Sequence, residues 1–331
     1  MMFLISIITP CFNEEENIDE LHRRIAAQFV DIPDCDYEHV FIDNASTDGT
    51  VAAIRRLASA DSRVKAILNS RNFGHIRSPM HALLQARGDA IITMASDLQD
   101  PPELIPAFIA KWREGFRVVA GVKPQSQESA AMSFIRRAYY RTIGRIADVK
   151  LIANFTGFGL YDRTVVEIAR RYDDPYPYFR GMVADIGFAH AEIPYEKPRR
   201  AGGITKNNFY TLYDLAMLGI TSYSKLPLRL ATMAGFALSL LSLVVALAYL
   251  VLKLVYWDRF GLGMAPVLIG MFFLASVQLF FIGILGEYIA NIHTQVQKRP
   301  LVVERERINF EAIPSQRDAE CVAHDDNRTR T

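Results

Sequence analysis

Two long runs without a charged residue lie near the C-terminal end of this 331-residue chain, at Leu230–Leu252 and Gly261–Gly286. They contain 23 and 26 residues, and about 20 apolar residues are enough for a helix to cross the hydrocarbon core of a bilayer. A buried hairpin in a soluble protein is the alternative, but two such runs in tandem favour the membrane. The runs therefore predict a pair of transmembrane helices, which divides the chain between two solvents.

The charges around these runs indicate which side of the membrane the rest of the chain occupies. Basic residues exceed acidic ones by four between residues 199 and 229 and by two within residues 298–307, whereas the loop between the runs has a surplus of one. Lys and Arg next to membrane spans are enriched on the cytoplasmic side. We therefore expect a multi-pass protein of the inner (cytoplasmic) membrane, with the N-terminal domain and both termini in the cytoplasm.

The first two hundred residues carry a different pattern, in which short β-rich runs alternate with segments of helical periodicity. Such alternation is typical of βαβ units and predicts a mostly parallel, Rossmann-like α/β sheet. The predicted strands are Leu4–Thr9, His39–Asp43, Val64–Asn69, Ala90–Ser96, Arg117–Val122, Phe158–Asp162 and Ala189–Pro194. The predicted helices are Glu15–Phe29, Thr50–Ala60, Ile76–Ala86, Pro102–Glu114, Ala131–Ile146, Arg163–Arg171 and an amphipathic Thr211–Ile220, which lies on the membrane surface or packs on the soluble domain.

Composition excludes several other classes of protein. The 37 Lys and Arg residues nearly balance the 36 Asp and Glu residues, so the chain lacks the basic excess that holds nucleic acids. The three cysteines are far apart and lack the spacing of metal ligands or of a disulfide framework. We interpret Cys11 as a small buried residue rather than a reactive thiol.

Polar segments follow four of the predicted strands, at Pro10–Glu14, Asp43–Asp48, Arg71–His75 and Asp97–Asp100. Ligands of parallel α/β sheets bind beyond the carboxyl ends of the strands, so these segments are expected to meet in space. Neither the dinucleotide-binding GxGxxG pattern nor the Walker loop is present in them. They predict a site for a nucleotide or another phosphate ligand of a different type.

The residue types in these segments suit particular parts of such a ligand. The Asp43 carboxylate can accept hydrogen bonds from a base or ribose, whereas Asp48 is better placed to cap the next helix. Oxygen ligands from Asp97, Gln99 and Asp100 suit Mg²⁺ or Mn²⁺ bridging to a diphosphate, because these hard cations take few ligands from protein and the others from phosphate and water.

Taken in order, the motifs resemble the polyprenyl-phosphate glycosyltransferases, GT-A-fold enzymes of glycosyltransferase family 2 that include dolichyl-phosphate mannose synthase and the bactoprenol glucosyltransferases. The similarity covers about residues 3–300 and rests on TPCFNEEENI, DNASTDGT, RNFGH, DLQDPPELIP, YFRG, RRAGGITK and GITSYSKLPLRL, followed by two spans and GEYIA. It implies inverting transfer of a monosaccharide from a nucleotide sugar, usually a UDP-sugar, to undecaprenyl or another polyprenyl phosphate. It also implies a divalent metal, Mg²⁺ or Mn²⁺, and assembly into a homo-oligomer, a tetramer.

The resemblance also implies roles for individual residues. The metal and diphosphate ligands correspond to Asp97 and Gln99, with Asp97 central to catalysis, and the phosphate-holding loop to the segment with Arg200 and Lys206. A lipid-headgroup anchor is the alternative for that loop. The residues corresponding to the nucleotide-sugar site are Pro10, Phe12, Asn13, Glu14, Asp43, Arg71 and Gly74.

The chain departs from the family pattern at several positions. The first Asp of the usual Asp-X-Asp is Ala95, and in Asp-Asp-Gly-Ser the second Asp and the Gly are Asn44 and Ala45. The residue commonly proposed as the catalytic base is Gly157, whereas Asp185 stands where relatives mostly have Trp. We hypothesise that a catalytic carboxylate has moved to Asp185.

The acceptor makes the loss of a base tolerable. The second pKa of a phosphate monoester is about 6, so the attacking oxygen is already mostly anionic at pH 7. For this phosphate we favour Arg136, Arg137 and Arg141, because the resemblance implies a basic pair about one turn earlier, near Ser133, and positions three or four apart share a helix face. A solvated basic helix face is the alternative for these three arginines.

The predicted organisation is therefore a cytosolic GT-A domain plus a two-helix transmembrane hairpin. We expect a catalytic domain over 1–198, a phosphate-binding loop and juxtamembrane helix over 199–228, transmembrane helices over 229–290, and a partly disordered cytoplasmic tail over 291–331. Two other functions stay open, a catalytically silent nucleotide-sugar or lipid binder and a processive polysaccharide synthase. Two spans and the lack of a Gln-X-X-Arg-Trp motif disfavour the synthase.

Overall fold

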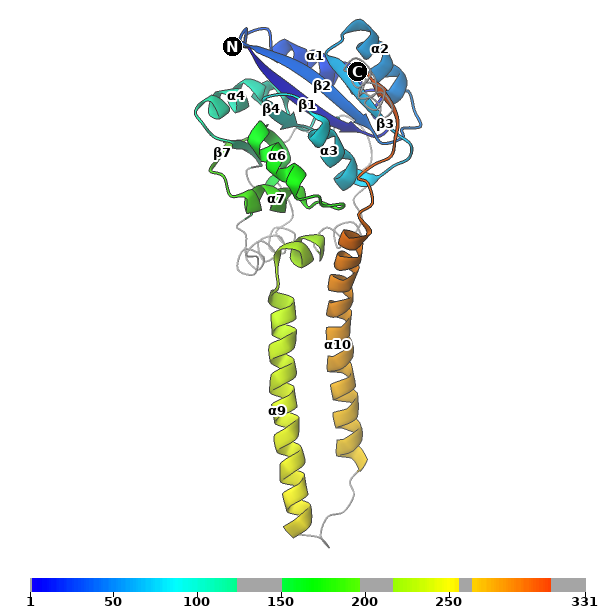
Figure 1. Ribbon diagram of the computed structural model, residues 1–331, viewed down its shortest axis with the longest axis vertical. Helices are drawn as coiled ribbons and strands as arrows, with labels where there is room; N and C mark the ends of the chain where they lie inside the picture. The colour runs from blue at the N-terminus through cyan, green and yellow to red at the C-terminus, as the bar shows by residue number, and fades with distance from the viewer. Residues whose placement is uncertain (1, 124–150, 197–216, 256–263, 311–331) are drawn as a thin grey trace, which may run out of the picture.

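The computed structural model describes residues 2–123, 151–196, 217–255 and 264–310 (Figure 1). An eight-stranded sheet has the order β7-β5-β6-β4-β1-β2-β3-β8. Its strands are β1 (Phe3–Cys11), β2 (Cys35–Asp43), β3 (Val64–Asn69), β4 (Ala90–Thr93), β5 (Val118–Val122), β6 (Phe155–Asp162), β7 (His190–Pro194) and β8 (Glu304–Ile308). Strand β1 runs parallel to β2 and β4, and β2 runs parallel to β3. This confirms the predicted mostly parallel α/β sheet.

Helices cover both faces of this sheet. The helical elements of the domain are α1 (Ile18–Gln28), α2 (Thr50–Ala60), α3 (Gly74–Gln85), the 3₁₀ turn η1 (Pro102–Leu104), α4 (Ile105–Arg113), α6 (Arg163–Arg171) and α7 (Phe179–Ile186). The side chains of Ile5 and Ile7 pack with α1 and α4, whereas Ile8 packs with α3, α6 and α7 on the other face. All three isoleucines are fully buried, because a parallel strand between two helical layers is covered on both sides.

Strand β4 ends at Thr93, three residues before the predicted end at Ser96. The chain turns here because Leu98 adopts a left-handed conformation with φ 58° and the Ala95 N–H donates to Asp100 Oδ2 at 3.0 Å. Alternating apolar residues alone do not reveal this turn, because Met94 is buried as a strand residue would be.

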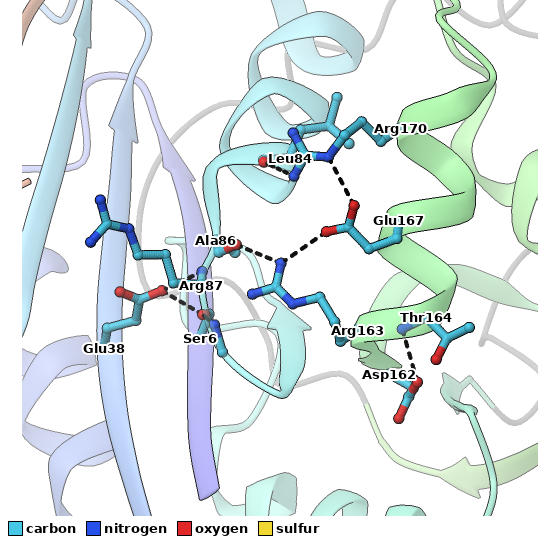
Figure 2. Close-up of polar contacts among 11 residues, drawn as sticks. Ser6, Glu38, Leu84, Ala86, Arg87, Asp162, Arg163, Thr164, Glu167 and Arg170 are labelled. Carbon is cyan, nitrogen blue, oxygen red and sulfur yellow. Dashed lines mark hydrogen bonds and ion pairs between the residues drawn. The ribbon is translucent and has the colours of Figure 1, made fainter. Parts of the chain in front are cut away.

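Buried polar contacts brace the amino ends of the central strands (Figure 2). Glu38 Oε1 accepts hydrogen bonds from Ser6 Oγ at 2.5 Å and from the Arg87 N–H at 2.9 Å. Burial opposes the charge of Glu38, but hydrogen bonds from Lys65, Ser6 and Arg87 outweigh it and keep its pKa below the ordinary value. Arg163 ties the start of α6 to the end of α3 by donating to the Ala86 carbonyl at 2.8 Å. These contacts lie opposite the carboxyl ends of β1 and β4 and support the scaffold.

Two long helices, α9 (Leu226–Val255) and α10 (Met264–Gln297), run side by side away from the α/β domain (Figure 1). Both are long and apolar enough to cross a membrane, and their candidate spans are Leu226–Leu252 and Ile269–Gln297. The most apolar part of each span is not buried against the described chain. Their large apolar side chains are exposed along the helices. The helix pair agrees with the predicted hairpin, and α10 continues eleven residues beyond the predicted end of the second run at Gly286.

Residues 217–223 form a helix directly before α9. It covers part of the predicted amphipathic helix; residues 211–216 lie outside the described residues. The Tyr288 hydroxyl on α10 donates to the Ser224 carbonyl at 2.6 Å, and Tyr178 and Tyr223 have ring centroids 6.0 Å apart. The first contact attaches α10 to the end of the short helix, and the second attaches the short helix to the α/β domain.

The chain returns to the sheet after α10, which the sequence analysis did not predict. Strand β8 pairs antiparallel with β3, and the Ser70 N–H donates to the Val303 carbonyl at 2.9 Å. Arg55 on α2 pairs with Glu306 at 2.5 Å. The Asn309 amide donates to two carbonyls of the domain, those of Ala58 and Val64. The segment after α10 is thus part of the α/β domain.

The buried His39 predicts a loss of stability in acid. Its ring contacts Thr9 Oγ1 through Nε2 at 3.0 Å and the His22 Nδ1 through its own Nδ1 at 3.2 Å. Burial, and secondarily His22, holds the pKa of His39 well below its ordinary value of 6.5. Below pH 6.5 the unfolded chain therefore binds a proton that the folded chain excludes, and the free energy of unfolding falls by up to about 1.4 kcal/mol per pH unit.

We expect the thermal unfolding midpoint of the purified protein to decrease as the pH falls from 7.5 to 5.5. The variant His293→Gln changes an exposed histidine on α10, and its unfolding midpoint should decrease by the same amount. The unfolding midpoint of His39→Gln should change less with pH. An unfolding midpoint that is the same at both pH values would contradict this account of His39.

Candidate functional site

The sheet topology brings the predicted polar segments to one edge. Strands β1, β2, β3 and β4 are parallel, and β5 and β7 share their direction because β6 runs antiparallel to both β4 and β5. The segments that follow all six strands consequently leave the sheet on the same side. This is the carboxyl edge, where α/β sheets bind ligands, and we take it as the candidate site.

The segments after β1 and β2 form one hydrogen-bonded unit at this edge. Asn13 has a left-handed backbone with φ 57°; its N–H donates to Ser46 Oγ at 2.9 Å and its Oδ1 accepts the Thr47 N–H at 2.8 Å. The Glu14 N–H donates to Thr50 Oγ1 at 2.8 Å. Asn13 and Glu14, both predicted to contact the nucleotide sugar, thus also hold these two loops together.

Asp43 is the last residue of β2 and is fully buried. Its carboxylate accepts the Ser46 N–H at 3.1 Å, which turns the chain toward α2. The predicted site residue Pro10 lies opposite Ile42 on the neighbouring strand, and Phe12 is half-buried. Pro10, Phe12, Asn13, Glu14 and Asp43 therefore gather in one corner of the carboxyl edge, as the sequence analysis expects.

Cys11 lies in this corner and is buried. Burial, followed by the charges of Asp43, Glu14 and Asp48, raises the pKa of its thiol well above the ordinary value. Because the thiolate is the reactive form of cysteine, this environment makes the side chain inert. Cys11 is a packing residue, as interpreted from the sequence.

Asn44 joins this corner to the segment after β3, a role that sequence reasoning missed. Its Oδ1 accepts hydrogen bonds from the Phe73 N–H at 2.9 Å and from Asn69 Nδ2 at 3.2 Å, while its Nδ2 donates to the Gly74 carbonyl at 3.0 Å. An aspartate at this position has no N–H to donate to Gly74. Asn44 stands where the family usually has Asp, and its amide both donates and accepts hydrogen bonds that join the two segments.

The segment after β3 carries the predicted residues Arg71 and Gly74. Arg71 is exposed, and its guanidinium lies 4.0 Å from the centroid of the Phe73 ring. Gly74 begins α3 with φ +86°, a conformation that glycine adopts without the strain a Cβ would add. Both residues lie at the carboxyl edge, next to Asn44.

The segment after β4 presents Asp97 and Gln99 on a turn built around Asp100. The Gln99 N–H donates to Asp97 Oδ1 at 3.2 Å, and both side chains are half-buried. Asp100 is buried and accepts hydrogen bonds from the Ala95 N–H and, at 2.9 Å, from the Tyr195 hydroxyl. Burial raises its pKa above the ordinary value. Asp100, which the sequence analysis grouped with the metal ligands, therefore already has two partners that shape the turn.

Gly157, at the position of the family's proposed base, lies on β6 with φ +105°. Its carbonyl accepts hydrogen bonds from the Thr93 hydroxyl and from the Tyr161 hydroxyl. A Cβ at this position would meet nothing within 4 Å, so space alone does not exclude a side chain. The left-handed backbone does favour glycine.

Asp185 lies on α7, where its Oδ2 accepts the Tyr172 hydroxyl at 2.6 Å. Burial, followed by Asp185, raises the pKa of Tyr172 to about 12, so this hydroxyl stays protonated and donates. Within the described part of the chain, no hydrogen bond or ion pair joins Asp185 to Asp97 or Gln99. Its role in catalysis stays a prediction.

The donor set at the turn after β4 fits a divalent cation only in part. Asp97 and Gln99 supply side-chain oxygens, the ligand type that Mg²⁺ and Mn²⁺ prefer. Across the described residues, no group of three or more His, Cys, Asp or Glu is arranged to hold a metal ion. Asp97 and Gln99 therefore suit a cation that takes most of its ligands from a bound diphosphate and water.

The predicted phosphate-binding residues Arg136, Arg137, Arg141, Arg200 and Lys206 lie outside the described residues. The last described residues before these segments are Lys123, which follows β5, and Glu196, which follows β7. Both lie at the carboxyl edge. Lys123 also lies 5.8 Å from the centroid of the Tyr195 ring, next to Asp100.

Fold and site together define an α/β protein that binds its ligand at the carboxyl edge of the sheet and carries two membrane-type helices. Residues 6–168 match the sequence profile of glycosyl transferase family 2. An uncharacterized glycosyltransferase of Synechocystis sp. is 31% identical over 318 residues, which are 96% of this chain and 99% of the relative. The SfII prophage-derived bactoprenol glucosyl transferase of Shigella flexneri is 33% identical over 297 residues, 89% of this chain and 96% of the relative.

The chain belongs to glycosyl transferase family 2 and is a glycosyltransferase. The GT-A fold predicted from the motifs is confirmed. Among solved structures, a mannosyltransferase of Pyrobaculum calidifontis in complex with GDP-Man and Mn²⁺ is 18% identical, covering 90% of this chain and 88% of that one, with a TM-score of 0.45.

Proposed function

We propose that this protein transfers a monosaccharide, with inversion, from a nucleotide sugar to a polyprenyl phosphate at the cytoplasmic face of the membrane. One observation carries the proposal: the similarity to bactoprenol glucosyl transferases covers 96% of their length and includes both membrane-type helices. A water-soluble donor and a lipid acceptor require an enzyme with one part in each solvent. A UDP-sugar is the donor we favour.

The proposed chemistry places its main demand on the leaving diphosphate. A polyprenyl phosphate is already anionic at neutral pH, so its oxygen attacks the anomeric carbon without transferring a proton, and the nucleoside diphosphate leaves. Asp97 and Gln99 would hold the divalent cation, Mg²⁺ or Mn²⁺, that offsets the charge of the diphosphate when bound. The loops containing Asn13, Asp43 and Arg71 hold and orient the nucleotide.

Two anionic phosphates repel each other as they approach, so cationic side chains must bring them together. We propose Arg136, Arg137 and Arg141 for the acceptor phosphate, and Arg200 and Lys206 for the phosphates at the mouth of the site. The proposal is supported by Lys123 and Glu196, the last described residues before these two segments, which follow β5 and β7 at the carboxyl edge.

The proposal is tested with purified full-length protein in detergent, undecaprenyl phosphate, Mg²⁺ or Mn²⁺, and a panel of radiolabelled UDP- and GDP-sugars. A labelled lipid product from one donor supports it, and the anomeric configuration of the product reports inversion. Nucleotide binding without turnover across the whole panel would instead identify a silent binding protein. Product longer than one sugar per lipid would indicate a processive enzyme.

Asp185→Asn tests whether a catalytic carboxylate lies on α7. If Asp185 acts on the reacting atoms, its loss should lower kcat by about 10²-fold or more with little change in the donor KM. Tyr172→Phe removes the hydrogen bond to Asp185 at 2.6 Å but keeps the carboxylate, so it serves as the matched control and should retain most activity. Near-normal kcat in Asp185→Asn would assign this residue to the scaffold.

A further inference from the structure

A group of cations surrounds Phe73 at the junction between the catalytic domain and the end of α10. The guanidinium of Arg71 lies 4.0 Å from the Phe73 ring centroid, and that of Arg77 lies 5.3 Å from it. Arg77 also donates to the Pro300 carbonyl, three residues beyond the last residue of α10. Arg299 is the residue before Pro300, and its charge acts on Arg77. We call Arg71, Arg77 and Arg299 the junction arginines.

The junction arginines lack acidic partners among the residues that the structure describes. Two acids pair with residues near the junction arginines in sequence instead: Asp173 pairs with Lys298 at 3.1 Å, and Glu304 pairs with His81 at 2.5 Å. The Arg77 Nε is buried without an acceptor in the described structure. Burial, followed by the charges of Arg71 and Arg299, lowers the pKa of Arg77, so like charges oppose each other here.

The start of α3 adds to this positive potential. Its first turn contains no acidic residue, although the N-terminus of a helix favours negative charge. It carries His75 and Arg77 instead. Such an arrangement is unfavourable in isolation and becomes favourable when an anion binds, because phosphate oxygens accept charge-assisted hydrogen bonds from guanidinium groups.

An apolar surface leads along α10 to these arginines. Ile289, Ile292 and Val296 are 63%, 60% and 74% exposed, and their spacing of three and four residues places them on one face of the helix. Helix α10 ends at Gln297, one residue after Val296 and two residues before Arg299. A hydrocarbon chain lying along this face would therefore have its headgroup at the end of α10, next to the segment that carries Arg299.

We propose that the junction arginines bind the phosphate headgroup of a membrane lipid whose hydrocarbon chain lies along Ile289, Ile292 and Val296. Arg77 and Arg299 are not among the residues proposed to bind the nucleotide sugar, the metal or the acceptor. The inference does not depend on the proposed transfer reaction. The bound lipid would fasten the β3–α3 segment, with its donor-loop residue Arg71, to the membrane surface.

The test measures binding of short-chain lipids to the full-length protein in detergent, by native mass spectrometry or thermophoresis. Dihexanoyl phosphatidic acid and farnesyl phosphate are compared with inorganic phosphate and with dihexanoylglycerol, which lacks the phosphate. We expect at least one lipid phosphate to bind roughly tenfold more tightly than either reference compound, since both the charge and the chain contribute. Preference for farnesyl phosphate assigns the site to the acceptor, and preference for phosphatidic acid to bulk lipid; either supports the proposal.

Arg77→Gln/Arg299→Gln should weaken lipid binding by roughly tenfold or more. Arg23→Gln/Arg56→Gln removes the same charge on α1 and α2, where both arginines pair with acids, and should bind as the wild type does. Arg299→Gln alone changes an exposed residue and should also weaken lipid binding, so the test still holds if the double variant does not fold. Equal binding by the wild type and the Arg77/Arg299 variant would overturn the proposal, and so would binding of inorganic phosphate as tight as that of the lipids.

Discussion

Asp97→Ala is expected to reduce kcat/KM for glycosyl transfer by about 10²–10³-fold, the usual cost of removing one group that stabilises developing charge. Asp97 is the one carboxylate left in the family's Asp-X-Asp, since Ala95 has replaced the other. Asp100 does not substitute for it, because Asp100 already accepts hydrogen bonds from the Ala95 N–H and the Tyr195 hydroxyl. The loss should appear at every concentration of Mn²⁺ or Mg²⁺ that the wild type tolerates.

The measurement is the initial rate of sugar-lipid formation across a metal titration. Asp31→Ala, an exposed change outside the candidate site, controls for the loss of one negative charge. Gln99→Ala should cause a smaller loss that excess metal partly restores, because a neutral oxygen is the weaker ligand. If Asp97→Ala keeps more than half of the wild-type kcat/KM at saturating metal, another residue holds the diphosphate.

A chain that ends at residue 301 is expected to lose stability and donor affinity together. The truncation removes the β3–β8 ladder, the hydrogen bond from Ser70 to Val303, the Arg55–Glu306 pair and both bonds from Asn309. At about 1 kcal/mol for each exchanged hydrogen bond, the free energy of unfolding of the α/β domain should fall by about 3–5 kcal/mol. Donor affinity falls because Ser70 adjoins Arg71 in the donor loop.

Thermal unfolding followed by fluorescence and UDP titration of the detergent-solubilised protein measure the two effects. A chain that ends at residue 310 keeps every described contact of β8 and serves as the matched control. Glu304→Gln should destabilise the domain less than the truncation does, because it removes only one charge. That charge is stabilised in the folded protein, since hydrogen bonds from His81 and Arg307 outweigh burial and lower the pKa of Glu304 to about 2. Identical unfolding midpoints for chains ending at 301 and 310 would show that β8 does not support the domain.

The central strands could be predicted from the sequence because strands that are buried on both faces consist almost entirely of apolar residues. β1 and β3 read as near-continuous apolar runs, and the polar residues after them had to lie at one edge once the strands were parallel. Strand β8 could not be predicted in this way. Its sequence ERERI consists mostly of charged residues, and what makes it a strand is the open edge of β3, which lies more than two hundred residues earlier.

The candidate site shows the same division. Asp97 and Gln99 were found from residue type and position after a strand, but Asn44 acts through Phe73 and Gly74, about thirty residues away. Local patterns contain no trace of such a contact. The dual role of Asn13, a predicted ligand that also bonds Thr47, is likewise visible only once two loops have been brought together.

The position of β8 has a consequence for how this protein is made. The ribosome completes β1 to β7 first and then both long helices, so β3 remains an open strand edge until residues 304–308 emerge. Open edges invite pairing with other chains. Completion of the sheet must wait until the helix pair has been synthesised, so the closing step of domain folding comes after both long helices have left the ribosome.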